Sequence, residues 1–146
     1  MNDTTESPDP SVAEHVRRYL DTDGASGHLE AGVTNLLLTH RGRKTGRLHR
    51  TALFYGQDGD RHVLVASGSV VTATHPQWYL NLVEHPEAEI QVLARRFAVR
   101  ARTAEGAERA RLWELMVQLA PVYRAYAARS PRVIPVVVLE EVGPAV

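Results

Sequence analysis

The short spacing between apolar segments constrains the fold of this chain more than any other feature. Residues 34–40, 50–55 and 62–67 form three apolar runs, and fewer than ten residues separate each run from the next. A parallel strand pair needs a crossover of about a dozen residues or more, so neighbouring runs can pair only in antiparallel fashion. The three runs therefore predict an antiparallel meander, with a tight turn at residues 57–60.

The rest of the chain extends this pattern. Residues 89–93 and 97–103 alternate polar and apolar side chains, which is typical of a hairpin with one solvated face. Residues 133–140 form a last apolar run, in which Pro135 indicates an edge strand or a bulge. Helical spacing of apolar residues predicts helices at 11–21, where Ser11 and Glu14 have capping-box spacing, and at 76–85, 105–120 and 122–129.

These segments together predict the fold class. Closing about six strands into a barrel removes the exposed edges of the sheet. We therefore expect an α+β, mainly β fold, an antiparallel barrel with three or four helices packed outside it. Residues 1–10 are acidic and polar, which predicts a disordered tail, and we expect residues 11–146 to form a single domain.

The composition excludes several classes of function. The chain has no cysteine, which excludes disulfides, thiolate metal sites and a cysteine nucleophile. Its seven histidines have no metal-ligand spacing, so no metal is expected. The net charge is zero, which does not indicate a nucleic-acid partner. No apolar run reaches the roughly 20 residues that cross a bilayer, and we expect a cytoplasmic protein.

A basic turn between the first two apolar runs is the strongest candidate site. Gly42 and Gly46 bracket Arg43, Lys44 and Thr45. Glycine allows backbone amides to approach an anion closely, and the three side chains add two positive charges and a hydroxyl. Spacing alone leaves two interpretations equally open, a phosphate cradle or a solvated hairpin tip.

Three further groups of residues can carry chemistry. Ser67 and Gly68 end a predicted strand, where a small residue lets a flat ring approach the backbone. Trp78, Tyr79 and Asn81 open a predicted helix and can wall a ring system, although core packing is the commoner role of such aromatics. Tyr123 and Tyr126 are three residues apart and share one helical face.

In combination, four segments resemble the deazaflavin-dependent nitroreductase family. They are Leu-Leu-Leu-Thr-His-Arg-Gly-Arg-Lys-Thr-Gly (36–46), Val-Ala-Ser (65–67), His-Pro-Gln-Trp-Tyr-Leu-Asn-Leu (75–82) and Ile-Pro-Val-Val-Val-Leu (134–139). The resemblance extends from about residue 34 to residue 140. It implies an antiparallel split β-barrel that binds coenzyme F420, a deazaflavin with a phosphate and a polyglutamate tail.

The resemblance also implies site residues, by position. The basic turn would meet the phosphate and the tail, the second strand would run beside the ring, and the other segments would complete the wall. The implied cofactor-binding residues are Arg43, Lys44, Thr45, Gly46, His49, Arg50, Thr51, Ala52, Leu53, Phe54, Val65, Ala66, Ser67, Gly68, Gln77, Trp78, Tyr79, Leu80, Asn81 and Tyr123. The implied catalytic residues, as candidate proton donors, are Ser67, Tyr123 and Tyr126.

Four positions depart from the pattern of that family. Gly68 stands where a lysine is usual, and the loop after it is about one residue longer. Ala52 stands where a proline is usual, and Phe54 where some members have a tyrosine. Ala120 replaces a third tyrosine on the helix that precedes Tyr123.

The function implied is that of an F420-dependent oxidoreductase. It would pass a hydride from the reduced deazaflavin to an electron-poor small molecule, such as a quinone, a nitro compound or an activated double bond. Two alternatives stay open, an enzyme dependent on flavin mononucleotide and a non-catalytic cofactor carrier. We expect a monomer or homodimer. The helix at 11–21 packs on the core in the favoured interpretation and makes a peripheral membrane contact in the other.

Overall fold

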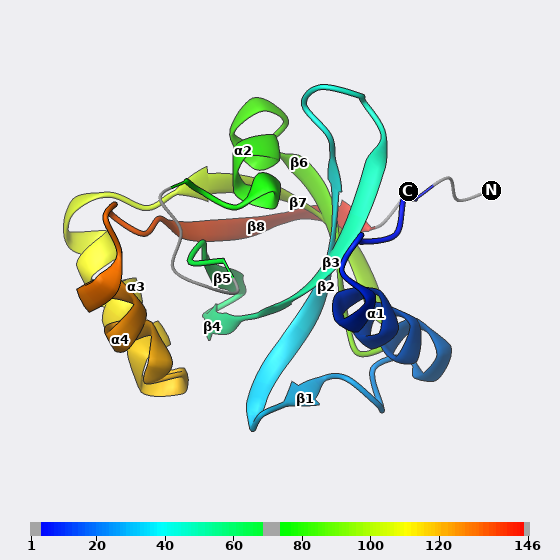
Figure 1. The fold of residues 1–146 in the computed structure, drawn as a ribbon, viewed down its shortest axis with the longest axis horizontal. Coiled ribbons are helices and arrows are strands. Elements are labelled where there is room, and N and C mark those ends of the chain that lie inside the picture. Colours follow the sequence, from blue (N-terminus) through cyan, green and yellow to red (C-terminus); the bar gives the residue numbers. More distant parts are fainter. Residues whose placement is uncertain (1–3, 69–73, 145–146) are drawn as a thin grey trace.

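The structure is a computed structural model that describes residues 4–68 and 74–144. This part of the chain forms four helices and eight strands (Figure 1). In order they are α1 (Pro10–Thr22), β1 (Leu29–Glu30), β2 (Val33–Arg41), β3 (Leu48–Phe54), β4 (Gly56–Asp58), β5 (Arg61–Val65), α2 (Gln77–Glu84), β6 (Glu87–Val92), β7 (Arg95–Thr103), α3 (Gly106–Leu119), α4 (Val122–Arg129) and β8 (Val136–Pro144).

The strands form one curled antiparallel sheet. Its order is β1-β2-β6-β7-β8-β5-β4, and β3 also pairs with β2. The helices lie around this half-barrel, with α1 beside β2 and β3 and with α3 and α4 together at the other side (Figure 1). The predicted antiparallel split barrel with outer helices is confirmed. The two strands beyond the expected six are β1 and β4, which have only two and three residues.

The predicted meander is wrong at its third strand. β2 and β3 form the expected hairpin, but β5 pairs with β4 and β8 instead of β3. The residues of β8 from Val136 to Leu139 are buried, so this strand gains most by lying inside the sheet, between β5 and β7. Pro135 therefore marks neither an edge nor a bulge. It precedes β8, and its carbonyl accepts a hydrogen bond from the Ala66 N–H at 2.9 Å.

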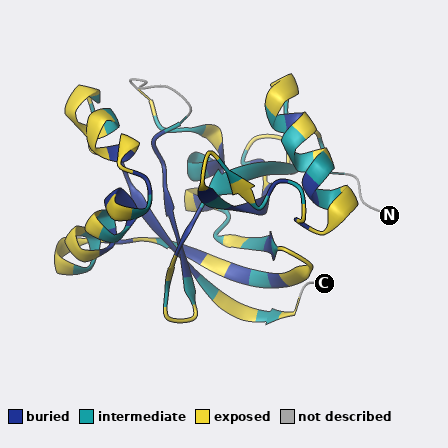
Figure 2. Ribbon diagram, turned by 90° about the horizontal axis from the view of Figure 1, so that it is seen from below, coloured by how far each residue is buried: buried dark blue, intermediate teal, exposed yellow. Residues whose placement is uncertain are grey.

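Two apolar clusters hold the sheet and helices together. One fills the curl of the sheet and includes Leu38, Leu64 and Ile90. The other lies between the sheet and α3 and includes Val65 and Met116. Figure 2 shows buried strands at the centre and exposed helix faces at the periphery. Each fully buried aliphatic side chain stabilises the fold by roughly 1.5–3 kcal/mol, so these clusters fix where the site residues stand.

The N-terminal segment lies against the sheet. Its Thr5 forms a parallel bridge with His49 and donates its N–H to the Leu48 carbonyl at 2.7 Å. The segment expected as a disordered tail is thus placed along β3 from residue 4 onward. Asp9, rather than Ser11, caps α1, because its carboxylate accepts the Ser11 N–H at 2.9 Å. Among the described residues, no helix has the length and apolar character needed to cross a membrane.

Candidate functional site

Two neighbouring cavities run along β3. The first has a volume of about 380 Å³ and surrounds the basic turn, and the second has about 410 Å³ and reaches the helix α4. Thr51 and Trp78 line both, so the two cavities meet at these side chains. The first cavity, which has charged side chains in its lining, therefore continues into the second, whose lining is largely aromatic and aliphatic.

The basic turn connects β2 to β3 and has a defined backbone. The Gly46 N–H donates to the Gly42 carbonyl at 2.9 Å, and the Gly42 N–H donates to the Arg47 carbonyl at 2.7 Å. Gly46 has φ +72°, a conformation that favours glycine. At Gly42 a Cβ would stand 3.0 Å from both His49 Nε2 and Thr45 Oγ1. The absence of a side chain at Gly42 therefore permits a close approach of the backbone to these two side chains.

The cations of the turn differ in how they are held. The Arg43 guanidinium donates to Asn81 Oδ1 at 2.7 Å and to Gln77 Oε1 at 2.9 Å, which ties the turn to the first turns of α2. Lys44 is exposed, and it makes no hydrogen bond or ion pair with any residue that the structure describes. Arg43 is thus a fixed wall of the cavity, and Lys44 is a charge available to an anion.

A buried histidine stands behind this wall. Asn81 Oδ1 also accepts the backbone N–H of Arg43, so its amide nitrogen is the group that faces His40 Nδ1 at 3.1 Å and donates to it. Burial, and then the neighbouring His49, lower the pKa of His40 to about 4. The neutral ring that this contact requires is therefore the stable form near neutral pH. His40 packs on His49 with ring centroids 5.7 Å apart.

The second cavity has aromatic walls. Tyr123 is buried, and its ring lies 6.4 Å from Phe54 and 6.3 Å from Tyr126, centroid to centroid. Burial raises the pKa of the Tyr123 hydroxyl, so it stays protonated throughout the ordinary pH range. Ser67 donates its hydroxyl to the Gly68 carbonyl at 3.1 Å. This cavity offers a largely apolar slot, and its lining includes the hydroxyl-bearing residues Ser67, Tyr123 and Tyr126.

The structure brings most of the predicted site residues to these two cavities. Those lining the first are Arg43, Lys44, Thr45, His49, Arg50, Thr51, Gln77, Trp78 and Asn81. Those lining the second are Thr51, Ala52, Leu53, Phe54, Val65, Ser67, Gly68, Trp78, Tyr123 and Tyr126. Four predicted residues line neither cavity: Gly46, Ala66, Tyr79 and Leu80. Tyr79 points elsewhere, with its hydroxyl 2.8 Å from Thr103 Oγ1.

Sequence reasoning missed other residues of the cavities. Ser7 and Pro8 reach the first cavity from the N-terminal segment, and His15 and Glu30 reach the second from α1 and β1. Nothing local in the sequence marks these positions, since their place depends on how distant segments pack. Pro8 lies within the segment that was expected to be a disordered tail.

An arginine supplies positive charge near the position where the usual lysine is missing. Arg132 donates through Nη1 to the Ala66 carbonyl and through Nη2 to the Ser67 carbonyl, each at 3.2 Å. Its guanidinium therefore lies at the end of the strand that leads to Gly68. The longer loop at 69–71, noted as a departure from the family, lies outside the described residues.

Comparison with known proteins identifies the family of the chain. The profile of the F420H2-dependent quinone reductase family matches residues 11–141. An F420H2-dependent quinone reductase of Mycobacterium tuberculosis is 39% identical over 129 residues, which cover 86% of each chain. A solved F420H2-dependent reductase, FDR-A, has 30% identity and a TM-score of 0.65, and the match covers 73% of this chain and 93% of that one.

The curled sheet and the family match thus define a deazaflavin-type oxidoreductase of the split-barrel class. The chain belongs to the F420H2-dependent quinone reductase family. This confirms the expected family, fold and enzyme class, with coenzyme F420 as the cofactor that the family indicates. The two alternatives, a flavin mononucleotide enzyme and a non-catalytic carrier, do not match that family.

Proposed function

We propose that this chain binds reduced coenzyme F420 along the two joined cavities and uses it to reduce a quinone. The observation that carries the proposal is the continuity of the cavities at Thr51 and Trp78. A ligand with an anionic tail and a flat ring fits such a pair, because one cavity offers cations and the other an apolar slot. The relatives named F420H2-dependent quinone reductases support this assignment.

The first cavity fits the phosphate and tail of the cofactor. Lys44 is exposed and without a partner among the described residues, which leaves its ammonium available to a phosphate. Arg43 cannot turn as freely, since Asn81 and Gln77 hold its guanidinium. We assign it the role of a fixed positive wall, which orients the tail at little cost in side-chain entropy.

The second cavity fits the ring and the acceptor. When bound, the reduced cofactor supplies a hydride, and the residues of the chain position the ring and the acceptor and exclude water. Phe54 and Trp78 contribute flat apolar surface to this cavity. Ser67, Tyr123 and Tyr126 line this cavity, and we assign their hydroxyls hydrogen bonds to the oxygens of the acceptor.

Membrane contact and assembly are part of the same proposal. A quinone with a lipid tail would be reached most directly from a membrane surface, and α1 carries Val12 at the second cavity. A solved structure with 31% identity and a TM-score of 0.68, which is a domain-swapped dimer, supports a homodimer. We place the protein in the cytoplasm, in peripheral contact with the membrane through α1.

A binding titration tests the first cavity. Purified protein is titrated into oxidised F420, and the change in cofactor fluorescence is followed. We expect Lys44→Ala to weaken binding about tenfold at low salt and less at high salt, because the contact is ionic. Arg129→Ala is the matched control, since this exposed arginine on α4 lines neither cavity. Equal affinity of the wild type and Lys44→Ala would remove the basic turn from the phosphate site.

A further inference from the structure

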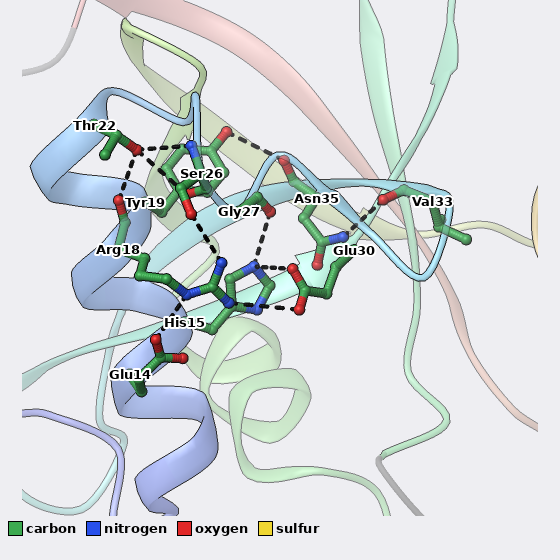
Figure 3. A network of polar contacts seen from close by, with 10 residues as sticks. All are labelled: Glu14, His15, Arg18, Tyr19, Thr22, Ser26, Gly27, Glu30, Val33 and Asn35. Atoms are coloured by element: carbon green, nitrogen blue, oxygen red, sulfur yellow. Dashed lines mark hydrogen bonds and ion pairs between the residues drawn. The ribbon is translucent and has the colours of Figure 1, made fainter.

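A histidine and a glutamate form one end of the second cavity, opposite the tyrosines of α4. His15 comes from α1 and Glu30 from β1, and both line the cavity that also contains Phe54 and Tyr123. Figure 3 shows the two side chains turned toward each other, in a network that includes Arg18 and the loop between α1 and β1. Neither residue has a place in the function proposed so far.

The imidazole of His15 is held in one orientation. Its Nε2 lies 2.8 Å from the Gly27 carbonyl, which can only accept, so Nε2 carries a hydrogen. Gly27 has φ +119°, and a Cβ there would stand 3.1 Å from Cδ2 of the ring. The edge with Cδ2 and Nε2 thus rests against a glycine that no other residue replaces easily. Nδ1 lies on the opposite edge and has no hydrogen-bond partner among the described residues.

Glu30 links this imidazole to solvent. One of its carboxylate oxygens lies 3.8 Å from His15 Nε2, an ion pair when the ring is protonated, and the other lies 3.5 Å from Arg18 Nη2. Arg18 in turn donates to Glu14 at 2.7 Å and to Ser26 at 3.0 Å. The His15 side chain is 14% exposed and that of Glu30 is 42% exposed. Water therefore reaches the carboxylate while the ring stays mostly covered.

Reduction of a quinone needs a proton as well as a hydride. The acceptor gains two electrons with the hydride, and one oxygen then carries a negative charge until it is protonated. The hydroxyls on the opposite wall are poor acids for this step. Burial raises the pKa of Tyr123, and the Ser67 hydroxyl is a far weaker acid that already donates to the Gly68 carbonyl. An imidazole is suited to donate a proton near neutral pH.

We infer that His15 is the general acid of the reaction, with Nδ1 of its imidazolium as the proton donor to the quinone oxygen. The inference rests on the proposed function. The proton moves to the quinone oxygen as the quinone takes the hydride, which gives the hydroquinone, and the ring becomes neutral. A proton from solvent, admitted beside Glu30, restores the imidazolium. The proton that hydride transfer leaves on the cofactor would pass to solvent, so protons and electrons balance.

A comparison of two acceptors isolates the proton. Menadione needs a hydride and a proton, whereas a triarylmethane dye cation takes a hydride on carbon and needs no proton. We expect His15→Gln to lower kcat with menadione about 100-fold, within the range of general-acid effects. The rate with the dye and the Kd for oxidised F420 should each change less than twofold. Glutamine retains an N–H for the Gly27 carbonyl, so the loop keeps its contact.

His85→Gln is the matched control. This histidine follows α2 and lines neither cavity, so its loss should leave both rates unchanged. An equal loss with both acceptors in His15→Gln would show that the residue only shapes the cavity. An unchanged menadione rate would remove His15 from the proton path. Either result overturns the inference while leaving F420 binding, and with it the proposed function, intact.

A measurement without turnover completes the test. The ¹⁵N resonances of the histidine rings are recorded for the protein alone and with saturating menadione, in the absence and the presence of oxidised F420. We expect the Nδ1 signal of His15, identified by its loss in His15→Gln, to move on addition of menadione while the His85 signals stay in place. No shift in either condition would contradict contact between His15 and the acceptor. Binding of F420 is read separately by its fluorescence.

Discussion

The two cavities differ in how the sequence builds them. The first is formed mainly by a hairpin turn and the start of one helix, and hydrogen bonds among Arg43, Asn81 and His40 fix its wall. The second is assembled from α1, β1, β3, β5 and α4, and packing of rings holds it. A polar network is rigid but sensitive to protonation, whereas a packed wall is sensitive to volume. We therefore expect protonation to disrupt the first cavity and changes of side-chain volume to disrupt the second.

Acid should weaken the first cavity most. The pKa of His40 is about 4 in the folded protein, below the ordinary value of 6.5, so the unfolded chain binds the proton more readily. The contribution of neutral His40 to the free energy of unfolding is fully present above pH 6.5. It is lost as the pH falls from 6.5 through 4. This lowering of the pKa corresponds to a loss of about 3 kcal/mol in the free energy of unfolding at pH 4.

Urea unfolding at pH 7 and pH 4 measures this loss. The comparison is with His40→Gln, whose amide oxygen can still accept from Asn81 but takes up no proton. Lowered pKa values of His28, His62 and His75 act equally in both proteins and cancel in the difference. We expect the wild type to lose about 3 kcal/mol more than the variant. Identical losses would show that His40 titrates normally and does not depend on the network.

A change of volume should damage the second cavity instead. Gly56 packs under α3, and a Cβ there would stand 2.5 Å from Met116 Sδ and 2.8 Å from Leu115 Cδ2. Gly56→Ala should therefore displace α3 and, through it, the Tyr123 wall on α4. We expect a loss of about 2 kcal/mol in the free energy of unfolding and a raised KM for menadione. The Kd for F420 at low salt should change little, since the charges of the turn are untouched.

The double variant Gly56→Ala, Met116→Ala serves as the check. Shortening Met116 removes the nearer of the two atoms that the new methyl group meets, so the two changes should compensate in part instead of adding. Full additivity of the two losses, measured by urea unfolding, would mean that the methyl group is accommodated by the backbone. In that event the KM of Gly56→Ala for menadione should also equal the wild-type value.

The same contrast explains which parts of the molecule could be predicted from sequence. The basic turn is local, and two glycines around Arg43, Lys44 and Thr45 are visible in five residues. Short connections likewise fixed the antiparallel pairing of β2 with β3. The strands with which β5 pairs could not be predicted, because this pairing depends on the burial of β8, about 70 residues further along the chain. Local pattern determines turns and strands, while competition for the core determines which strands become neighbours.

The missed site residues follow the same rule. His40 ends a run that is buried on both faces, so alternation could not tell which side chain faces Asn81. His15 and Glu30 meet only because Gly27 lets the loop after α1 approach the imidazole, a long-range result of backbone conformation. A two-residue strand such as β1 carries too little pattern to be recognised.

The smallest expected effect on stability lies at Tyr123. Its hydroxyl has no hydrogen-bond partner among the described residues, so Tyr123→Phe should change the free energy of unfolding by less than about 0.5 kcal/mol. If the hydroxyl donates to the acceptor, the KM for menadione should rise about fivefold, the value of one neutral hydrogen bond. The rise should be equal at pH 6 and pH 9, because burial raises the pKa of this tyrosine. Tyr79→Phe, whose hydroxyl contacts Thr103 outside both cavities, should leave that KM unchanged. A KM effect shared by both variants would assign the hydroxyl of Tyr123 to packing and leave His15 as the group that faces the acceptor oxygen. An effect that fades at pH 9 would show instead that the hydroxyl ionises there and that burial does not hold it protonated.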